Sequence, residues 1–334
     1  MTLEKTYVFG CLIQGYEVEM LDEHLQSCKM MLEGIDNPEN VHFDFCINLQ
    51  EHFEQYENPR KTEIRIVDAI MRFASPDTFH VNWYVCSGNA PDYFYNIASY
   101  RRDLCHNWAN KVDFVCWSET DSLWPKQTLN IVDQIASADD VVPKFLLTFA
   151  YRLNWDASWA KLVHPIFRSV KYEETAEFIF TNEASEKAYM PLSRMDAIND
   201  IPVEEIVVEA FSQPKADGSC LVISSELIRS GVNIPLGLIH CGEDESLCRM
   251  AKLVMGDEFV QYHVSNILRV HNRRHPRKRT GILNENNPTG LCSAKDKGTW
   301  WDALEQTSKF NLEHLRTQRK MFKAVEVVDE YRIK

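Results

Sequence analysis

The chain has 334 residues, of which 45% are hydrophobic and 25% are charged, and its formal net charge is −13 at pH 7. This length and composition are those of a folded protein with one large domain or two modest ones. The negative net charge argues against a generally cationic protein that coats nucleic acid or a membrane surface, although it does not exclude a local basic groove.

Ten cysteines are scattered along the chain without a Cys-x-x-Cys pair, and many stand inside apolar runs. That usage is typical of reduced, buried thiols in a cytoplasmic protein. The first residues show no charged start followed by a long apolar run, and no stretch reaches the roughly 18 apolar residues of a membrane span. We therefore expect a cytoplasmic protein, in the host cytoplasm if it is viral, with no signal peptide and no membrane partner.

Short apolar runs alternate with helical periodicity over the first 135 residues. The patterns predict strands at 7–13, 41–47, 79–86 and 112–117 and helices at 19–32, 64–73, 95–109 and 126–135. This alternation predicts an α/β domain with a mainly parallel central sheet. No Gly-x-Gly-x-x-Gly follows a strand and no Walker A motif is present, which argues against a dinucleotide site and a P-loop.

Two carboxylates follow the strand at 112–117, in the segment Ser118-Glu119-Thr120-Asp121. In an extended segment, side chains two positions apart point the same way, so Glu119 and Asp121 would present oxygen ligands to one side. Open α/β sheets bind ligands just past the ends of their strands. Carboxylates together with diphosphate oxygens suit Mg²⁺ or Mn²⁺, and the structural alternative is a solvated acidic loop.

The region 141–206 predicts no definite element. Trp155 and Trp159 lie there in an aromatic patch that is either core or a wall for a base or sugar. Further on, we expect a strand at 220–223, a helix at 246–255 directly after an acidic cluster at 243–245, and a strand-like run at 259–270 that ends at His271. The helix dipole alone also favours carboxylates at such a helix start. An amphipathic helix is expected between 300 and 334.

The ordered set of these segments resembles the GT-A fold glycosyltransferases of the large family-two type, over residues 5 to 275. The segments that carry the resemblance are the β-α-β-α-β half, the Arg-bearing helix before Glu119-Thr120-Asp121, the strand Gly218-Ser219-Cys220-Leu221-Val222-Ile223, the Gly242-Glu243-Asp244 motif and the strand end Val270-His271. Two positions depart from the family. Glu119 stands where the family has Asp, and Asn48 follows the second strand where the family often has an Asp that contacts the nucleobase.

The resemblance implies a metal-dependent glycosyltransferase that moves a sugar from a nucleotide-sugar donor to an acceptor hydroxyl. It implies Mn²⁺ or Mg²⁺ as cofactor, because the leaving diphosphate needs its charge neutralised. Asp121 and Glu119 would ligate the metal. His271 would be the third ligand, with His275 and a plain strand-end histidine as the alternatives.

The resemblance also implies a base that removes the proton of the acceptor hydroxyl, namely Asp244, with Glu243 as the fallback. The candidates for donor binding are Gln14, Asn48, Arg101, Arg102, Ser118 and Thr120, of which the arginines would meet the phosphates. The candidates for acceptor binding are Trp155, Trp159, Gly218, Ser219, Arg273, Arg274, Arg277, Lys278 and Arg279. The expected organisation is a catalytic domain at 1–290, with a nucleotide-binding half at 1–135 and an acceptor half at 136–290, and a helical extension at 291–334.

Six cationic side chains lie between residues 269 and 279 of this acidic chain. They indicate either a solvated loop, a clamp on the donor diphosphate, or contact with a polyanionic acceptor such as DNA, since Arg and Lys that neutralise phosphates give sequence-independent affinity. A basic edge of the active site, formed by these residues, would suit phage-type enzymes that glycosylate hydroxymethylated DNA bases and flip the base to reach it. Two rival functions stay open: a transferase for a glycan, protein or small molecule, and an inactive nucleic-acid-binding or interaction module.

Overall fold

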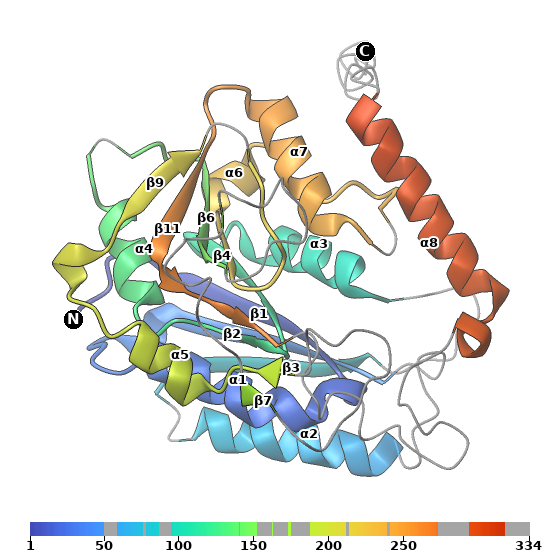
Figure 1. The fold of residues 1–334 in the computed structure, drawn as a ribbon, viewed down its shortest axis with the longest axis horizontal. Coiled ribbons are helices and arrows are strands. Elements are labelled where there is room, and N and C mark those ends of the chain that lie inside the picture. Colours follow the sequence, from blue (N-terminus) through green and yellow to red (C-terminus); the bar gives the residue numbers. More distant parts are fainter. Residues whose placement is uncertain are drawn as a thin grey trace, which may run out of the picture.

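The fold was analysed in a computed structural model. It describes residues 1–49, 59–75, 78–86, 95–139, 141–151, 162, 173–174, 188–211, 214–238, 241–272 and 294–317. Within these residues, helices cover both faces of an eight-stranded sheet whose strand order is β3-β2-β1-β4-β10-β6-β11-β9 (Figure 1).

The strands of this sheet are β1 (Tyr7–Gln14), β2 (Val41–Asn48), β3 (His80–Cys86), β4 (Phe114–Glu119), β6 (Phe145–Ala150), β9 (Val208–Phe211), β10 (Leu221–Ser224) and β11 (Val260–Leu268). β1 is parallel to β2 and β4, β2 to β3, and β6 to β11. β10 is antiparallel to β4 and β6, and β9 to β11. Within this eight-stranded sheet, only β9 and β10 are therefore antiparallel to the other strands. The predicted α/β class with a mainly parallel sheet is confirmed.

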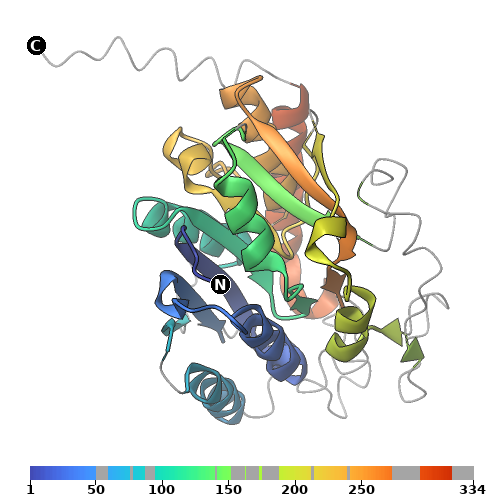
Figure 2. The same cartoon turned by 90° about the vertical axis from the view of Figure 1, so that its left-hand side faces the viewer.

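Two large hydrophobic clusters pack on the sheet, one on each face, and a third, smaller cluster gathers around α5 (Leu192–Ile198) and the ends of β6 and β11. The helices α1 (Val18–Met31), α2 (Pro59–Ala74) and α4 (Thr128–Ala136) contribute to the first cluster. The helices α3 (Ile97–Trp108), α6 (Ser225–Arg229), α7 (Glu243–Met255) and α8 (Ala294–Thr317) contribute to the second. Figures 1 and 2 show α1 and α2 together on one side of the sheet and α7 with α8 on the other. β1 and β4 are buried almost throughout, as expected of central parallel strands covered on both faces.

Shorter elements complete the described part of the chain. They are η1 (Gly15–Glu17), η2 (Pro38–Asn40), η6 (Val203–Glu205) and α5 (Leu192–Ile198), together with the two-residue strands β5 (Ser122–Leu123), β7 (Glu173–Glu174), β8 (Ala188–Tyr189) and β12 (Val270–His271). β12 pairs antiparallel with β5, and β7 with β8. No helix of the described chain has both the length and the apolar character needed to cross a bilayer.

The predicted strands and helices are present, with three differences that bear on function. Glu119 is the last residue of β4 and does not lie beyond the strand. α7 begins at Glu243, so the acidic cluster forms its first turn and does not precede it. The central strand β6 and the edge strand β9 were not predicted. A continuous apolar run such as that of β6 fits a buried helix as well as a buried strand, which is why the pattern left it open.

The predicted C-terminal helix is α8, which ends at Thr317 within the described chain and packs on α7. Leu312 of α8 contacts Gly242, the N-cap residue of α7, so closely that a Cβ on Gly242 would lie 2.6 Å from its Cδ2. Arg316 binds both carboxylate oxygens of Glu245 in the first turn of α7, at 2.8 and 2.6 Å. α8 therefore holds the acidic start of α7, although the domain boundaries at 135 and 290 stay predictions.

Leu315 gives a direct test of how firmly α8 is packed. Its side chain is 3% exposed and belongs to the second hydrophobic cluster. We expect Leu315→Ala to lower the free energy of unfolding by about 2–5 kcal/mol, because it removes buried methyl groups and leaves a cavity. Urea denaturation measures this loss. Phe310→Ala on the same helix is the control, since Phe310 is 62% exposed and its loss should cost at most about 0.5 kcal/mol. Equal effects would show that α8 is not docked on α7.

Candidate active site

A two-residue strand pairing brings the third candidate ligand to the acidic segment. In the β5–β12 ladder, His271 lies opposite Ser122 and Val270 lies opposite Leu123. The backbone N–H of Asn272 also donates to the main-chain oxygen of Asp121 at 2.6 Å. The chain after β11 is thereby fixed beside the turn that follows β4.

Glu119, Asp121 and His271 offer one ligand atom each, and these atoms all lie within 4.8 Å of one another. Nε2 of His271 is 3.0 Å from Oε2 of Glu119 and 3.4 Å from Oδ1 of Asp121. Asp121 and His271 are buried, whereas the Glu119 side chain is 26% exposed, so the cluster opens to solvent on the Glu119 side. The three sequence candidates for metal ligation therefore lie together.

The charges of the cluster favour a cation at its centre. Burial alone would lower the pKa of His271, but the carboxylates of Asp121 and Glu119 outweigh burial and hold that pKa well above its ordinary value. The pKa of Glu119 is lowered, because His271 and Arg101 together outweigh the effect of its burial. The carboxylates thus favour the protonated, positively charged form of the imidazole between them. A bound metal ion would supply the positive charge in place of that proton.

Arg101 connects the two acidic segments of the chain. Its Nη2 binds Oε1 of Glu119 at 2.8 Å and its Nη1 binds Oε1 of Glu243 at 2.5 Å. Nη2 also donates to the carbonyl oxygen of Gly218 at 2.6 Å, and the guanidinium lies over the ring of Trp117 at 5.0 Å. The side chain is 1% exposed. Arg101 is therefore an internal link between the metal candidates and α7, and its predicted role at the donor phosphates stays a prediction.

Gly218 makes room for this link, which gives a second testable prediction. A Cβ built on Gly218 would lie 1.9 Å from Nη1 and 2.3 Å from Cζ of Arg101. We expect Gly218→Ala to push the guanidinium away from its partners and to lower the free energy of unfolding by about 1–3 kcal/mol, the usual cost of overpacking. Chemical denaturation checks the loss. Gly237→Ala is the matched control, because the nearest atoms to its Cβ would all belong to the Asn311 side chain, at 3.2 Å or more.

Asp217 forms a second ion cluster behind His271. Its Oδ1 accepts bonds from Nη2 of Arg269 at 3.0 Å and from the N–H and hydroxyl of Ser219 at 2.9 and 2.6 Å. Its Oδ2 is 3.4 Å from Nδ1 of His271. Burial would raise the pKa of Asp217, but Arg269 and His271 outweigh it and hold the pKa well below its usual range. Arg269 also lies over the Tyr151 ring at 4.1 Å.

The whole cluster carries more acidic than basic groups. Five carboxyl groups, those of Glu119, Asp121, Asp217, Glu243 and Asp244, are linked by contacts or mutual electrostatic influence to three basic groups, the guanidinium groups of Arg101 and Arg269 and the imidazole of His271. A divalent cation would offset the excess of negative charge. Two carboxylates and an imidazole are ligands that Mn²⁺ accepts, and Mg²⁺ favours the oxygens. The residues present therefore fit the metal that the sequence predicts.

Asp244 lies in the first turn of α7, beside Glu243. Its Oδ1 accepts a hydrogen bond from the N–H of Glu245 at 2.7 Å. Burial, together with the charges of Glu243 and Asp217, raises the pKa of Asp244 to about 8, although Arg101 opposes the shift. A carboxyl group with such a pKa can take a proton near neutral pH, as a general base must.

The other donor-binding candidates differ in how well their positions suit that role. Gln14 ends β1, and its Oε1 is buried without a hydrogen bond to any residue that the structure describes, so a ligand could use it. Ser118 accepts a bond from Trp124 Nε1 at 2.7 Å, and Asn48 donates to the Tyr95 carbonyl at 3.1 Å. Thr120 is fully buried. These bonds are structural, and the donor roles of the residues stay predictions.

Arg102 and Arg269 are both bound by groups of the protein itself. The guanidinium of Arg102 binds the carbonyl oxygens of Ile234, Pro235 and Leu238, which places it in the loop before α7. Arg269 is 4% exposed and paired with Asp217. The inclusion of Arg269 in a basic surface was therefore wrong.

Seven acceptor-binding candidates lie outside the described residues: Trp155, Trp159, Arg273, Arg274, Arg277, Lys278 and Arg279. The two that the structure describes, Gly218 and Ser219, contact Arg101 and Arg269 respectively. His275, the rival metal ligand, also lies outside the described part of the chain.

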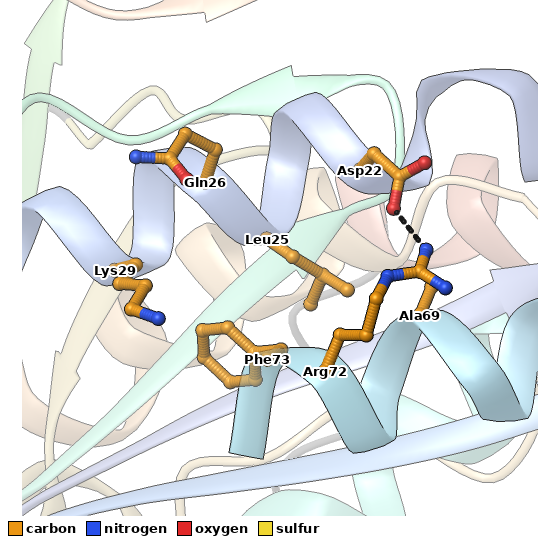
Figure 3. Close-up of a pocket in the computed structure, with 7 residues that line it drawn as sticks. All are labelled: Asp22, Leu25, Gln26, Lys29, Ala69, Arg72 and Phe73. Carbon is orange, nitrogen blue, oxygen red and sulfur yellow. Dashed lines mark hydrogen bonds and ion pairs between the residues drawn. The ribbon is translucent and has the colours of Figure 1, made fainter. Parts of the chain in front are cut away.

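The hollow between α1 and α2 is a separate feature (Figure 3). It is lined by Asp22, Leu25, Gln26 and Lys29 of α1 and by Ala69, Arg72 and Phe73 of α2. Its volume of about 200 Å³ is below the roughly 300–1,000 Å³ of ordinary ligand pockets. An ion pair of 3.0 Å between Asp22 and Arg72 satisfies the charges at its edge, so the hollow has no evident chemical role.

Sequence reasoning missed Asp217 and Arg269 as members of the site. A local signal was present for Arg269, because it stands two residues before His271 and side chains two apart in an extended segment point the same way. Both side chains do contact Asp217. Asp217 itself gave no such signal, since Arg269 and His271, the partners that tie it to the site, follow it by more than fifty residues.

No protein-family model matches the chain, and no curated protein matches its sequence. Among solved structures, TarS 1–349 of S. aureus in complex with UDP-GlcNAc is similar with a TM-score of 0.42 and 11% identity, covering 96% of this chain and 76% of that one. In another structure of TarS 1–349 the chain spans only 60% of that protein.

Two further similar structures are of other proteins. Glucosyl-3-phosphoglycerate synthase of Mycobacterium tuberculosis with phosphoglyceric acid has a TM-score of 0.41 and 12% identity, with 80% of this chain and 72% of that one covered. GalNAc-T7 with UDP, GalNAc and Mn²⁺ has a TM-score of 0.41 and 10% identity, with 80% of this chain and 44% of that one covered. At these scores and identities the likenesses assign the chain to no family.

Proposed function

We propose that the chain is a metal-dependent glycosyltransferase that moves a sugar from a nucleotide-sugar donor to an acceptor hydroxyl. One observation carries this proposal. The acidic segments at 119–121 and 243–244, far apart in sequence, meet through the buried Arg101, which binds Glu119 and Glu243 at once. His271 joins the first segment to form a set of three candidate metal ligands.

Each group of this arrangement has a role in such a transfer. Glu119, Asp121 and His271 would hold a divalent cation, which when bound neutralises charge on the leaving diphosphate. Asp244 removes the proton of the acceptor hydroxyl as that oxygen attacks the sugar. Arg101 binds both Glu119 and Glu243, and this supports a common site for the metal candidates and the start of α7, to which the proposed base Asp244 belongs.

A donor screen by thermal shift tests the proposal. The full chain is heated with UDP-, GDP-, CMP- and dTDP-sugars, each with and without Mn²⁺. A ligand that binds the folded state at 100 times its Kd stabilises it by about 2.7 kcal/mol, which raises Tm by a few degrees. We expect at least one donor to raise Tm only when Mn²⁺ is present. If Mn²⁺ and every donor leave Tm unchanged, the chain is not a metal-dependent glycosyltransferase.

The acceptor that we propose is a hydroxymethylated base in DNA. The support is the basic residues at 273–279, which follow the metal ligand His271 directly in the chain. Binding to duplex DNA should then weaken with salt and in Arg274→Ala and Arg277→Ala, because each phosphate contact releases counterions. If DNA does not bind even at low salt, the acceptor is of another class, and a glycan, protein or small-molecule hydroxyl is the alternative.

A further inference from the structure

The two ring nitrogens of His271 face different carboxylates. Nε2 points to Glu119 and Asp121, at 3.0 and 3.4 Å. Nδ1 points the other way, to Oδ2 of Asp217, at 3.4 Å. A neutral imidazole carries one N–H and one lone pair, and the hydrogen bond made by one nitrogen decides which nitrogen can bind a metal. Asp217 is therefore placed to decide this for His271.

The two oxygens of Asp217 have separate tasks. Oδ1 is engaged by structural bonds from Ser219 and Arg269, which leave it no part in holding His271. Oδ2 is directed at Nδ1 of His271. Since Asp217 is 2% and Arg269 is 4% exposed, water does not loosen these contacts. The Asp217 carboxylate is thus held in its orientation independently of its contact with His271.

We propose that Asp217 is a positioning residue for the metal site: it accepts the Nδ1–H of His271, so that the lone pair of Nε2 faces Glu119 and Asp121. Arg269 and Ser219 hold Asp217 in the orientation that this requires. Carboxylates that accept the second N–H of a metal-binding histidine fix its tautomer and its ring orientation, and they make it a stronger ligand. The inference rests on the proposed metal site and names residues that the sequence did not assign to it.

Asp217→Asn is the most direct test, with Mn²⁺ affinity of the full chain as the readout. The amide keeps an oxygen for Ser219 but turns an NH₂ group towards Nδ1, which favours the tautomer with its proton on Nε2. In the flipped orientation, the NH₂ group of the amide would face Ser219 and Arg269, which are also hydrogen-bond donors, so this orientation is disfavoured. We expect Mn²⁺ affinity, measured by titration of the free-Mn²⁺ electron spin resonance signal, to fall about 10–100-fold.

A double-mutant cycle separates this role from a general structural one. If Asp217 acts through His271, Asp217→Asn should change Mn²⁺ affinity less than about twofold once His271→Ala is present. Equal losses in both backgrounds would overturn the inference, as would an unchanged affinity in Asp217→Asn alone. Asp133→Asn is the matched control, because Asp133 is buried and accepts bonds from Glu4, Lys5 and Tyr7. It should lower Tm and leave Mn²⁺ affinity unchanged.

One measurement on the unaltered protein covers the case in which Asp217→Asn does not fold. With ¹⁵N-labelled histidine and bound Zn²⁺, a diamagnetic ion that accepts an imidazole nitrogen, the two-bond proton–nitrogen correlations of His271 should show a protonated Nδ1 and an unprotonated Nε2. The reverse pattern would overturn the inference. If the unaltered protein binds neither Mn²⁺ nor Mg²⁺, the proposed metal site itself fails. If it binds them and Asp217→Asn binds Mn²⁺ equally well, only the role of Asp217 fails.

Discussion

Asp121→Ala is expected to abolish Mn²⁺ binding and, with it, Mn²⁺-dependent hydrolysis of the nucleotide-sugar donor. The Asp121 side chain is 1% exposed and lies 3.4 Å from Nε2 of His271, so alanine at this position removes one of the two carboxylates of the candidate site. Loss of an outer partner of a ligand costs about 10–100-fold in metal affinity, and loss of a ligand itself should cost more than about 100-fold. Titration calorimetry with Mn²⁺ and an assay for released nucleotide diphosphate measure the two effects.

The variant should keep its local backbone, which makes the result interpretable. The bond from the N–H of Asn272 goes to the main-chain oxygen of Asp121, and alanine retains that oxygen. Asp22→Ala is the control, because Asp22 is an exposed carboxylate of α1 that pairs with Arg72 at 3.0 Å and has no contact with the site. It should leave Mn²⁺ binding and hydrolysis unchanged. Mn²⁺-dependent hydrolysis that survives in Asp121→Ala would refute the metal site.

The sequence singled out the three candidate metal ligands because their signals are local. Glu119 and Asp121 stand two apart at the end of an apolar strand, and His271 ends another strand-like run. The resemblance to a transferase family supplied the expectation that these segments meet. The pairing that brings them together, β5 with β12, is only two residues long on each strand, and a pattern with a period of two cannot be recognised over so short a run.

The contacts that surround the ligands could not be predicted in the same way. Arg101 was identified as a cation near the site, but its partner Glu243 is 142 residues away in sequence. Whether a buried guanidinium binds a protein carboxylate or a ligand phosphate depends on which strands and helices become neighbours. That neighbourhood follows from the strand order, in which β10 inserts between β4 and β6. Asp217 and Gly218 lie in the segment just before β10, which begins at Leu221.

Asp244→Asn is expected to reduce the rate of sugar transfer by about 10²–10⁴-fold, the usual contribution of a general base. Mn²⁺ affinity should stay the same, because Asp244 does not belong to the group Glu119, Asp121 and His271. The rate of the unaltered enzyme should depend on pH in a way set by Asp244. Burial and the charges of Glu243 and Asp217 raise its pKa to about 8, and the ionised form is the base, so kcat/KM should rise about tenfold per pH unit up to about pH 8.

The stability of the protein should change with pH in the opposite sense. A carboxyl group whose pKa is raised on folding stabilises the folded state below its ordinary pKa, and this contribution is lost as pH rises through the raised value. Asp244 should therefore make the unaltered protein less stable between about pH 4 and about pH 8. Asn keeps the oxygen that accepts the N–H of Glu245 and cannot ionise. Asp244→Asn should consequently show a higher Tm than the unaltered protein above pH 8, together with its loss of transfer.

These two results together distinguish a catalytic carboxylate from a helix-capping one. An acidic residue that only stabilises the first turn of α7 through the helix dipole would lower stability when neutralised, and it would leave the rate unchanged. Neutralising a general base whose ionised form is destabilised should instead raise Tm and lower the rate of transfer. The same destabilisation of the ionised carboxylate raises its pKa, so that it accepts a proton near neutral pH. Glu245→Gln provides the comparison on the same turn. Its carboxylate pairs with Arg316 and Arg249, and its pKa is lowered chiefly by the bond from Arg316, so its neutralisation should lower Tm and spare transfer.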